Sequence, residues 1–296
     1  MSYSQLTFAD KKFNVKLRYR LFKEARLSNE MLFSALPDEN LLSVLVDSNI
    51  DIYSFPIRTF LGESLDSISL SDAALWMDNV ALLKLNKFDD WWRKIGKKTR
   101  NMVRKAEKRG VIVKTLTECS DSVAESLWRI YNETPIRQGR WFKGYGTPKS
   151  VFKNWKIPDP KVGELLGAFW NGEMIGFLTL LYGDRVALIS QILSMVKHLD
   201  KAPNNALIAK AVERCCNRGI RFLIYARMGN HPTLDRFKES NGFVRYPIPR
   251  LYVPLSKKGN IAIKLKLHLE PQDLVPEAIK GKLIPLYNLL SRKLRL

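Results

Sequence analysis

A strongly basic segment with a regular apolar spacing, residues 93–109, constrains this chain more than any other feature. It holds nine basic residues and a single acid, Glu107. Five apolar residues in or beside it fall along one side of a helix: Trp92, Ile95, Met102, Val103 and Ala106. Gly110 then follows as a typical residue at the C-terminal end of a helix. The pattern predicts a helix held to a core by one stripe, with a positive face that meets an anionic partner.

The net charge of +20 is unevenly distributed along the chain. Residues 27–83 contain one basic and nine acidic side chains, whereas residues 11–26 carry seven basic and one acidic. Residues 245–296 carry eleven basic and three acidic. Charge in blocks favours an anionic partner, either nucleic acid or a lipid surface, over a general role in solubility.

Composition narrows the class of protein. Of the 296 residues, 46% are hydrophobic and 26% are charged, which is ordinary globular usage. No run of about 18 uncharged apolar residues is present, so no transmembrane segment is predicted. The N-terminus lacks a secretory signal pattern, and Cys119, Cys215 and Cys216 fit neither a disulfide framework nor a zinc site. We therefore expect a cytoplasmic protein without a metal, with peripheral contact on the inner face of the membrane as a further expectation.

Periodicity predicts a mixed α/β chain with a central sheet. A helix is expected over 38–47 and a strand over 80–85, although most of the first 85 residues carry weak signals. The predicted elements that follow are a strand at 111–116, helices at 121–133 and 148–155, a hairpin around Asn171 and Gly172, a helix at 204–218, a strand at 221–226, a helix at 233–240 and a strand near 250–255. With the strand that leads back from the hairpin, the order is β-α-α-β-β-β-α-β-α-β.

Three stretches resemble known proteins. The hairpin N-G-E-M-I-G-F-L and the run T-L-D-R-F-K-E-S-N-G-F at 233–243 resemble elements of GNAT acyltransferases. The run K-K-T-R-N-M-V-R-K-A-E-K-R-G-V-I-V at 97–113 is similar to the R-x-x-I-R-K-A-x-K-x-G-V-x-V signature of Fem-type peptidyltransferases and their acyltransferase relatives. The resemblance covers residues 97–255, a little over half of the chain.

The resemblance implies an α/β (mixed α+β) GNAT fold with a central mixed sheet. A reduced N-terminal GNAT-like half would precede a full C-terminal half. The expected segments are an N-terminal GNAT-like or accessory region (1–90), a basic linking helix (91–110), a GNAT-like acyltransferase domain (111–256) and a basic amphipathic C-terminal tail (257–296). The tail suits an anionic lipid surface, and packing on the protein body is the alternative.

The donor is expected to be polyanionic, either aminoacyl-tRNA or acyl-CoA. Typical GNAT proteins hold the CoA pyrophosphate with a glycine-containing motif at the start of the central helix. Here that stretch is K-H-L-D-K-A-P-N-N-A-L, which lacks those glycines and agrees with Fem-type members that use aminoacyl-tRNA. The candidate donor- or phosphate-binding residues are Arg100, Arg104, Lys105, Lys201, Asn204 and Asn205. The two asparagines are also expected to cap the central helix.

Acyl transfer to an amine needs a positioned carbonyl, a stabilised oxyanion and a route for the amine proton. The candidate catalytic residues are Tyr225, Arg227, Lys238 and His198. In GNAT folds the donor carbonyl lies where two central strands separate, which would place Tyr225 and Arg227 at the end of one of them. Lys238 matches the family's F-K position, and His198 has a pKa suited to proton transfer. The alternatives are a hydrogen-bonded structural role for Tyr225 and Arg227, a solvated helical lysine for Lys238, and an incidental loop histidine for His198.

The loop over 136–146 mixes cations with aromatic side chains, which can stack on rings while contacting phosphate. Its candidate acceptor-binding residues are Arg137, Arg140, Trp141 and Tyr145. The resemblance thus predicts a Fem-like N-acyltransferase that modifies an amine of a cell-envelope or polysaccharide precursor. Two alternatives stay open: an acyl-CoA-dependent N-acyltransferase of a small molecule or sugar nucleotide, and a non-catalytic protein that binds RNA or an anionic membrane.

Overall fold

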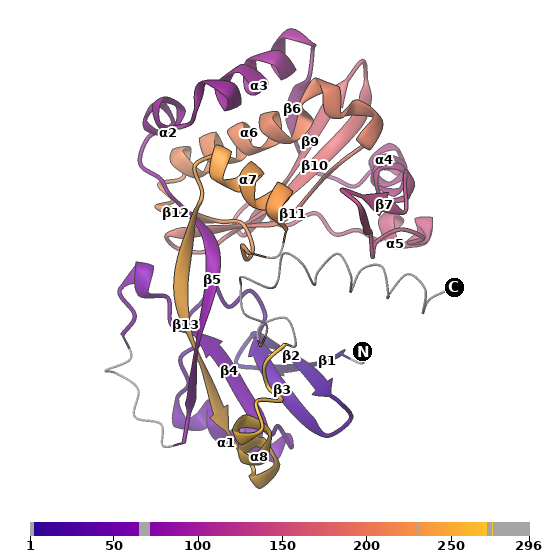
Figure 1. Cartoon of the computed structure of the whole chain (residues 1–296). Coiled ribbons are helices and arrows are strands. Elements are labelled where there is room, and N and C mark those ends of the chain that lie inside the picture. The colour runs from indigo at the N-terminus through magenta and orange to yellow at the C-terminus, as the bar shows by residue number, and fades with distance from the viewer. Residues whose placement is uncertain (1–2, 65–71, 230, 271–273, 275–296) are drawn as a thin grey trace. The chain divides into compact units, whose positions relative to one another are not determined.

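The computed structural model describes residues 3–64, 72–229, 231–270 and 274 (Figure 1). The chain forms two compact units, one of residues 80–245 and one that combines 1–79 with 246–296. Two strands, β5 (Ala74–Lys84) and β13 (Val244–Pro254), run from one unit into the other. The unit boundaries therefore fall inside strands, whereas the expected segments were divided at 90, 110 and 256. The predicted mixed α/β class is confirmed.

The central sheet of the 80–245 unit has the strand order β5–β12–β11–β10–β9–β6. Its further strands are β6 (Ile112–Leu116), β9 (Gly163–Trp170), β10 (Glu173–Tyr182), β11 (Val186–Ser194) and β12 (Phe222–Ile224). Among the described pairings, β11 and β12 run parallel and the other neighbours run antiparallel. Helix α6 (Pro203–Asn217) is the crossover that a parallel pair requires.

Local sequence signals explain several of these elements. Asn171 and Gly172 join β9 to β10 with φ angles of 48° and 80°, the left-handed pair that a two-residue hairpin turn favours. Helix α4 (Asp121–Asn132) begins at Ser120, whose hydroxyl accepts a hydrogen bond from the backbone N–H of Val123. The predicted hairpin is confirmed, and the Ser120 cap sets the start of the helix predicted at 121–133.

Helices cover both faces of this sheet. On one face lie α2 (Phe88–Lys94), α3 (Lys97–Lys108), α6 and α7 (Pro232–Ser240), and on the other lie α4 and α5 (Lys149–Lys153) (Figure 1). A small hairpin, β7 (Ile136–Arg137) and β8 (Arg140–Trp141), separates α4 from α5. From β6 to β13 the order is the predicted one, with this hairpin and the short 3-10 helix η3 (Val196–Lys201) added.

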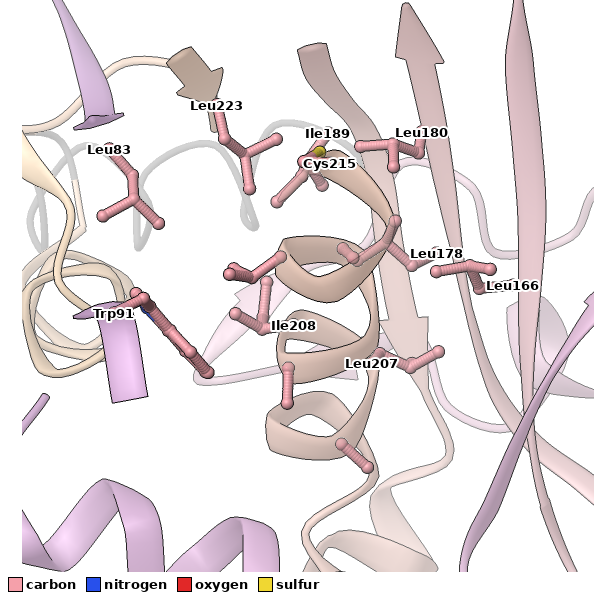
Figure 2. Close-up of a cluster of buried hydrophobic side chains, with 14 of the residues drawn as sticks. Leu83, Trp91, Leu166, Leu178, Leu180, Ile189, Leu207, Ile208, Cys215 and Leu223 are labelled. Atoms are coloured by element: carbon pink, nitrogen blue, oxygen red, sulfur yellow. The ribbon is translucent and has the colours of Figure 1, made fainter. Parts of the chain in front are cut away.

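The main core surrounds α6. Figure 2 shows Leu207, Ile208 and Cys215 of this helix among sheet residues such as Leu178, with Trp91 of α2 nearby. All five side chains are buried because α6 lies between the sheet and the α2–α3 pair. Because α6 is buried on two sides, it is held firmly in the core. The loops at its two ends are therefore attached to a rigid element.

The basic segment is not one helix, which corrects the prediction. Helix α2 ends at Lys94, Ile95 is extended with ψ of 147°, and Gly96 is the N-cap of α3. Trp91 donates its indole N–H to Asn241 O at 2.9 Å, and Thr99 donates its hydroxyl to Ser240 O at 2.8 Å. Each short helix is thus tied separately to the end of α7, and the chain bends between the two anchors.

The other unit has a sheet of order β1–β2–β3–β4–β13. Its remaining strands are β1 (Tyr3–Phe8), β2 (Lys11–Arg18), β3 (Phe22–Leu27) and β4 (Ile52–Pro56). Helix α1 (Glu39–Asp47), predicted at 38–47, packs on one face of the sheet, and α8 (Lys257–Lys264) packs on the other. A 3-10 turn, η1 (Thr59–Leu61), follows β4. Strands β1 to β3 were not predicted.

No helix within the described ranges combines the length and the apolar character that crossing a bilayer requires. Most of the expected C-terminal tail, residues 271–273 and 275–296, lies outside the described residues.

Candidate functional site

The two parallel strands at the centre of the 80–245 unit separate after a short contact. Strand β11 pairs with β12 over Val186 to Leu188 only, and β12 ends at Ile224. Beyond this point β11 continues to Ser194, paired on its other side with β10. Within the described part of the chain, the backbone groups of β11 that face away from β10 have no strand partner after Leu188. They can accept the extended part of a ligand, and the predicted separation of these strands is confirmed.

A β-bulge lies in β11 at this separation. Leu180 pairs with Ile189 and Thr179 pairs with Gln191, so Ser190 is the inserted residue. Ser190 is exposed between buried Ile189 and half-buried Gln191. A bulge turns backbone N–H and C=O groups out of the ladder and re-aims the strand. Here the inserted Ser190 lies two residues beyond Leu188, the last residue of β11 that pairs with β12.

Lys238 of α7 is a buried lysine at this end of the sheet. Its side chain is 1% exposed, and its Nζ donates to Arg227 O at 2.7 Å. The same Nζ lies 4.7 Å from the ring centre of Tyr225. No carboxylate in the described ranges pairs with it, and burial lowers its pKa, although Asp235 partly offsets the effect. Among the described residues, its three N–H donors have one hydrogen-bond acceptor, Arg227 O.

Tyr225 and Arg227 follow β12 directly, as predicted. The ammonium of Lys238 lies over the ring face of Tyr225. Burial raises the pKa of Tyr225 above the usual range, so its phenol stays neutral. The backbone turns sharply here, since Ala226 has φ of 49°. Arg227 contributes its carbonyl oxygen to Lys238. The structure thus brings together three of the four predicted catalytic residues.

The fourth, His198, lies in a different cluster. It is 8% exposed in η3, its ring is 5.4 Å from that of Trp170, and its Nε2 is 3.4 Å from Glu173 Oε2. These partners belong to the end of β9 and the start of β10, whereas Lys238 contacts Arg227 and Tyr225. Its packing against Trp170 indicates a structural role at the start of α6.

The start of α6 differs from the expected capping by Asn204 and Asn205. Ala202 is the N-cap, with φ of 56° and no side-chain cap, and Pro203 is the first helical residue. Both asparagines therefore lie within the first turn of the helix. The Oδ1 atom of Asn204 is buried without a hydrogen-bond partner in the described part of the chain. Pro203 has no N–H, and the N–H groups of Asn205 and Ala206 donate to Ala202 O, so the backbone at this helix start offers an anion the N–H of Asn204.

Cations from α3 and η3 gather near this helix start. Arg109 pairs with Asp200 at 2.8 Å, and Lys201 pairs with the same carboxylate at 3.2 Å. Hydrogen bonding by Lys201, with the positive fields of Arg109 and Lys105, lowers the pKa of Asp200. Lys201 also lies 4.2 Å from the ring centre of Trp170. We call Lys105, Arg109 and Lys201 the α3–η3 cation cluster. One acid against three cations leaves a net positive site.

Two of the predicted phosphate-binding residues have structural partners instead. Arg100 donates to the carbonyl oxygens of Trp92, Arg93 and Ile95, at 3.2, 3.1 and 2.5 Å. It therefore closes the C-terminal end of α2, where carbonyls lack helical partners. The guanidinium of Arg104 lies 5.5 Å from the ring centre of Trp92. The bend at Gly96 causes both contacts, because it folds α3 back toward the end of α2.

Arg137, predicted to bind the acceptor, instead ties the β7–β8 hairpin to the sheet. Its guanidinium donates to Ser194 O at 2.6 Å and to Ile130 O, and it pairs with Glu133 at 3.5 Å. Burial lowers the pKa of Arg137. Glu133 in turn accepts from the backbone N–H groups of Val196 and Lys197. The pair fixes the end of β11 relative to α4.

The other predicted acceptor residues lie on the outer side of this hairpin. Trp141 is 56% exposed and Tyr145 is 39% exposed, with ring centres 6.1 Å apart. Burial, followed by the positive charge of Arg140, lowers the pKa of His231 at the start of α7. The positive charge of Lys238 also lowers the pKa of His231. Charges of the hairpin and of both ends of α7 therefore act on each other.

Three further residues lie along or opposite the separated strand, and the sequence patterns indicate them weakly or not at all. Gln191 donates its side-chain amide to the hydroxyl of Tyr131 on α4, whose pKa is raised by burial. Thr179, paired with Gln191 across the ladder, has a buried hydroxyl without a hydrogen-bond partner among the described residues. Sequence spacing marks Tyr131 only as a core residue, and nothing in it marks the bulge that positions Gln191.

No protein-family model and no curated protein matches the sequence. Solved structures do match. FemX gives a TM-score of 0.59 at 10% identity, over 90% of this chain and 91% of that chain. A C-terminal domain (DUF2156) from Agrobacterium fabrum, provisionally named a lysylphosphatidylglycerol synthetase, gives 0.57 at 10% identity, over 88% and 87%. L-PGS from Bacillus licheniformis gives 0.56 at 12% identity, over 90% and 88%.

These likenesses establish the fold. The chain has the GNAT-like mixed α/β fold of FemX and L-PGS, and the resemblance inferred from residues 97–113 and 233–243 is confirmed. The matches extend over most of the chain. Identities this low leave the substrate to be argued from the site itself.

Proposed function

We propose that this protein is a Fem-like N-acyltransferase that transfers an acyl or aminoacyl group to an amine of a cell-envelope or polysaccharide precursor. The observation that carries the proposal is Lys238, a buried lysine held by Arg227 O just after the end of β12, the strand from which β11 separates. An ammonium near the point where the two strands separate would suit a carbonyl oxygen that becomes negative during acyl transfer.

The transfer itself would follow from these positions. The acceptor amine attacks the donor carbonyl carbon and forms a C–N bond, and the negative charge collects on the carbonyl oxygen. Lys238 and the β11 backbone hold that oxygen until the bond to the donor breaks. The proton lost by the amine passes to the departing donor oxygen or sulfur. Tyr225 keeps Lys238 in place through its ring face and stays neutral because of its raised pKa.

The donor site is proposed to be the α3–η3 cation cluster with the uncapped start of α6. Lys105, Arg109 and Lys201 supply positive charge beside the first turn of α6. Because the stretch before α6 lacks the usual glycines, side chains of α3 and η3 would replace backbone contacts to phosphate. A donor with many phosphates gains most from such a surface, which favours aminoacyl-tRNA over acyl-CoA.

The test measures group transfer with each donor separately. Purified protein is incubated with aminoacyl-tRNA or with acyl-CoA and an amine-bearing envelope precursor, and the product is identified by mass spectrometry. Phosphatidylglycerol, which offers a hydroxyl and no amine, is tested as a competing acceptor because the Agrobacterium fabrum domain is named for its lysyl derivative, and transfer to it alone would replace the proposed amine acceptor. We expect transfer from aminoacyl-tRNA, reduced at least about 100-fold in Lys238→Met. The exposed lysine variant Lys153→Met is the matched control.

Each other outcome has a defined meaning. Consumption of acyl-CoA alone would replace the proposed donor. Binding of RNA without turnover of either donor would support the non-catalytic alternative. Equal activity of Lys238→Met and wild type would remove Lys238 from the mechanism, provided that both proteins are folded.

A further inference from the structure

The loop that joins β12 to α7 takes an unusual backbone course beside the proposed transfer site. Two of its residues adopt the left-handed conformation, Ala226 with φ of 49° and Gly229 with φ of 101°. This conformation is costly for alanine, because its Cβ comes close to the following carbonyl oxygen. On the sheet side, Ala81 of β5 donates its N–H to Ala226 O at 2.8 Å. A loop of this shape persists only where neighbouring groups hold it along its length.

Helix α7 holds the other part of this loop through two side chains of opposite charge. Lys238 donates to Arg227 O at 2.7 Å. Asp235 Oδ2 accepts a hydrogen bond from the N–H of Gly229 at 2.9 Å. The two side chains are three positions apart on α7 and therefore lie on the same side of the helix. Asp235 thus fixes the far end of the segment that positions Lys238.

The charge of Asp235 also acts on Lys238. Burial lowers the pKa of Lys238, and the negative charge of Asp235 partly raises it again. The other titratable or charged side chains of the loop and its surroundings are a phenol, an imidazole and three guanidinium groups: Tyr225, His231, Arg140, Arg227 and Arg245. Among all these groups, Asp235 alone is negative at neutral pH. It is therefore the acid that balances the buried ammonium.

We infer that Asp235 is a positioning residue of the transfer reaction, which holds the β12–α7 loop and keeps the Lys238 ammonium where β11 separates from β12. The inference rests on the proposed function, since that function gives Lys238 the role of holding the carbonyl oxygen. Asp235 acts in two ways, through a hydrogen bond that needs an acceptor oxygen and through a charge that needs ionisation. Asparagine at this position keeps an acceptor oxygen without the charge, whereas alanine removes both.

The first test is the transfer assay across pH with variants of Asp235. Asp235→Ala should lower kcat at least about tenfold, and Asp235→Asn should recover most of that loss because its amide oxygen still accepts the hydrogen bond. In Asp235→Asn the alkaline limb of the kcat profile should move to lower pH, because Lys238 loses the charge that favours its ammonium form. A purely structural role for Asp235 would not move this limb.

Two further variants separate the loop from the charge. Gly229→Ala strains the loop at a φ of 101° but keeps the charge of Asp235. Its kcat should therefore fall without a shift of the alkaline limb. Glu239→Gln makes the same change in charge at an exposed position of α7 and is the matched control. It should keep the kcat and the pH profile of wild type, and thermal unfolding checks that each protein is folded.

The second test needs no turnover. Urea unfolding at several pH values compares each background, wild type or Asp235→Asn, with the same background carrying Lys238→Met. The stability advantage of Lys238→Met should begin to shrink at a lower pH in the Asp235→Asn background. An active wild type whose kcat profile and stability window are both unchanged by Asp235→Asn overturns the positioning role alone. A folded wild type that turns over no donor overturns the proposed function, and the positioning role with it.

Discussion

At the residue scale, Lys238 links stability to pH in a way that needs no substrate. Burial lowers its pKa in the folded protein below the ordinary value of 10.5. Between the two values the unfolded chain binds the extra proton, so the stability of the folded protein rises with pH across this alkaline window. Lys238→Met removes the group. Urea unfolding at several pH values should show a variant whose stability advantage is largest near neutral pH and shrinks toward pH 10.5.

The buried cysteines and tyrosines also titrate in the alkaline range, but they do so in both proteins. The difference between wild type and variant therefore isolates the lysine. A difference that stays constant with pH would show that Lys238 titrates like a solvent-exposed lysine. Its assigned role in holding an oxyanion would then lose its physical basis, since that role relies on a desolvated ammonium.

At the element scale, a change at the bulge in β11 should affect activity without affecting folding. Ile189 and Ile192 pack toward α6, whereas Gln191 faces Tyr131 on α4. Deleting Ser190 restores regular alternation without moving these side chains to the opposite faces. We expect a folded protein whose unfolding free energy lies within about 1 kcal/mol of wild type and whose transfer activity falls at least about 100-fold. Urea unfolding and the transfer assay measure the two effects, and full activity of the deletion would contradict the assignment.

The bend between α2 and α3 gives a second prediction at this scale. Arg100 closes the end of α2 through three carbonyl oxygens. Arg100→Met keeps much of the side-chain stem but leaves those carbonyls without this donor. We expect a loss of about 1–2 kcal/mol in unfolding free energy, with donor affinity nearly unchanged. Arg104→Met is the comparison, and a large loss of donor affinity in Arg100→Met alone would return that residue to the phosphate-binding set.

At the scale of the whole molecule, a net charge of +20 makes any assay of RNA binding sensitive to salt. The specific contribution of the α3–η3 cation cluster appears in the slope of log affinity against log salt. Replacing Lys105, Arg109 and Lys201 with glutamine should reduce the slope for aminoacyl-tRNA by roughly two. Lys153, Lys156 and Lys161 changed to glutamine give the same net charge. Equal slopes for the two triple variants would place donor binding elsewhere.

Periodicity and turn chemistry determined most of the elements from residue 111 onward. The Asn171–Gly172 turn, the Ser120 cap and the apolar face of α6 are local signals, because each depends on residues close in sequence. The motifs at 97–113 and 233–243 also pointed to the correct fold. Strands β1 to β3 were not predicted because Leu17 is exposed and Arg18 is buried. This reverses the usual alternation, in which apolar residues face the core and polar residues face solvent.

Only the tertiary structure decided which charged residues are available. The sequence patterns predicted that Arg100 and Arg137 contact a ligand. In the structure, each donates hydrogen bonds to backbone carbonyls of a neighbouring element. Lys238 reads as a solvated helical lysine and proves to be buried beside Tyr225. The basic segment itself determined a cationic helical surface, but its bend at Gly96 and its position near the start of α6 depend on long-range packing. Composition sets the amount of charge, whereas burial and pairing decide which charges can meet a ligand.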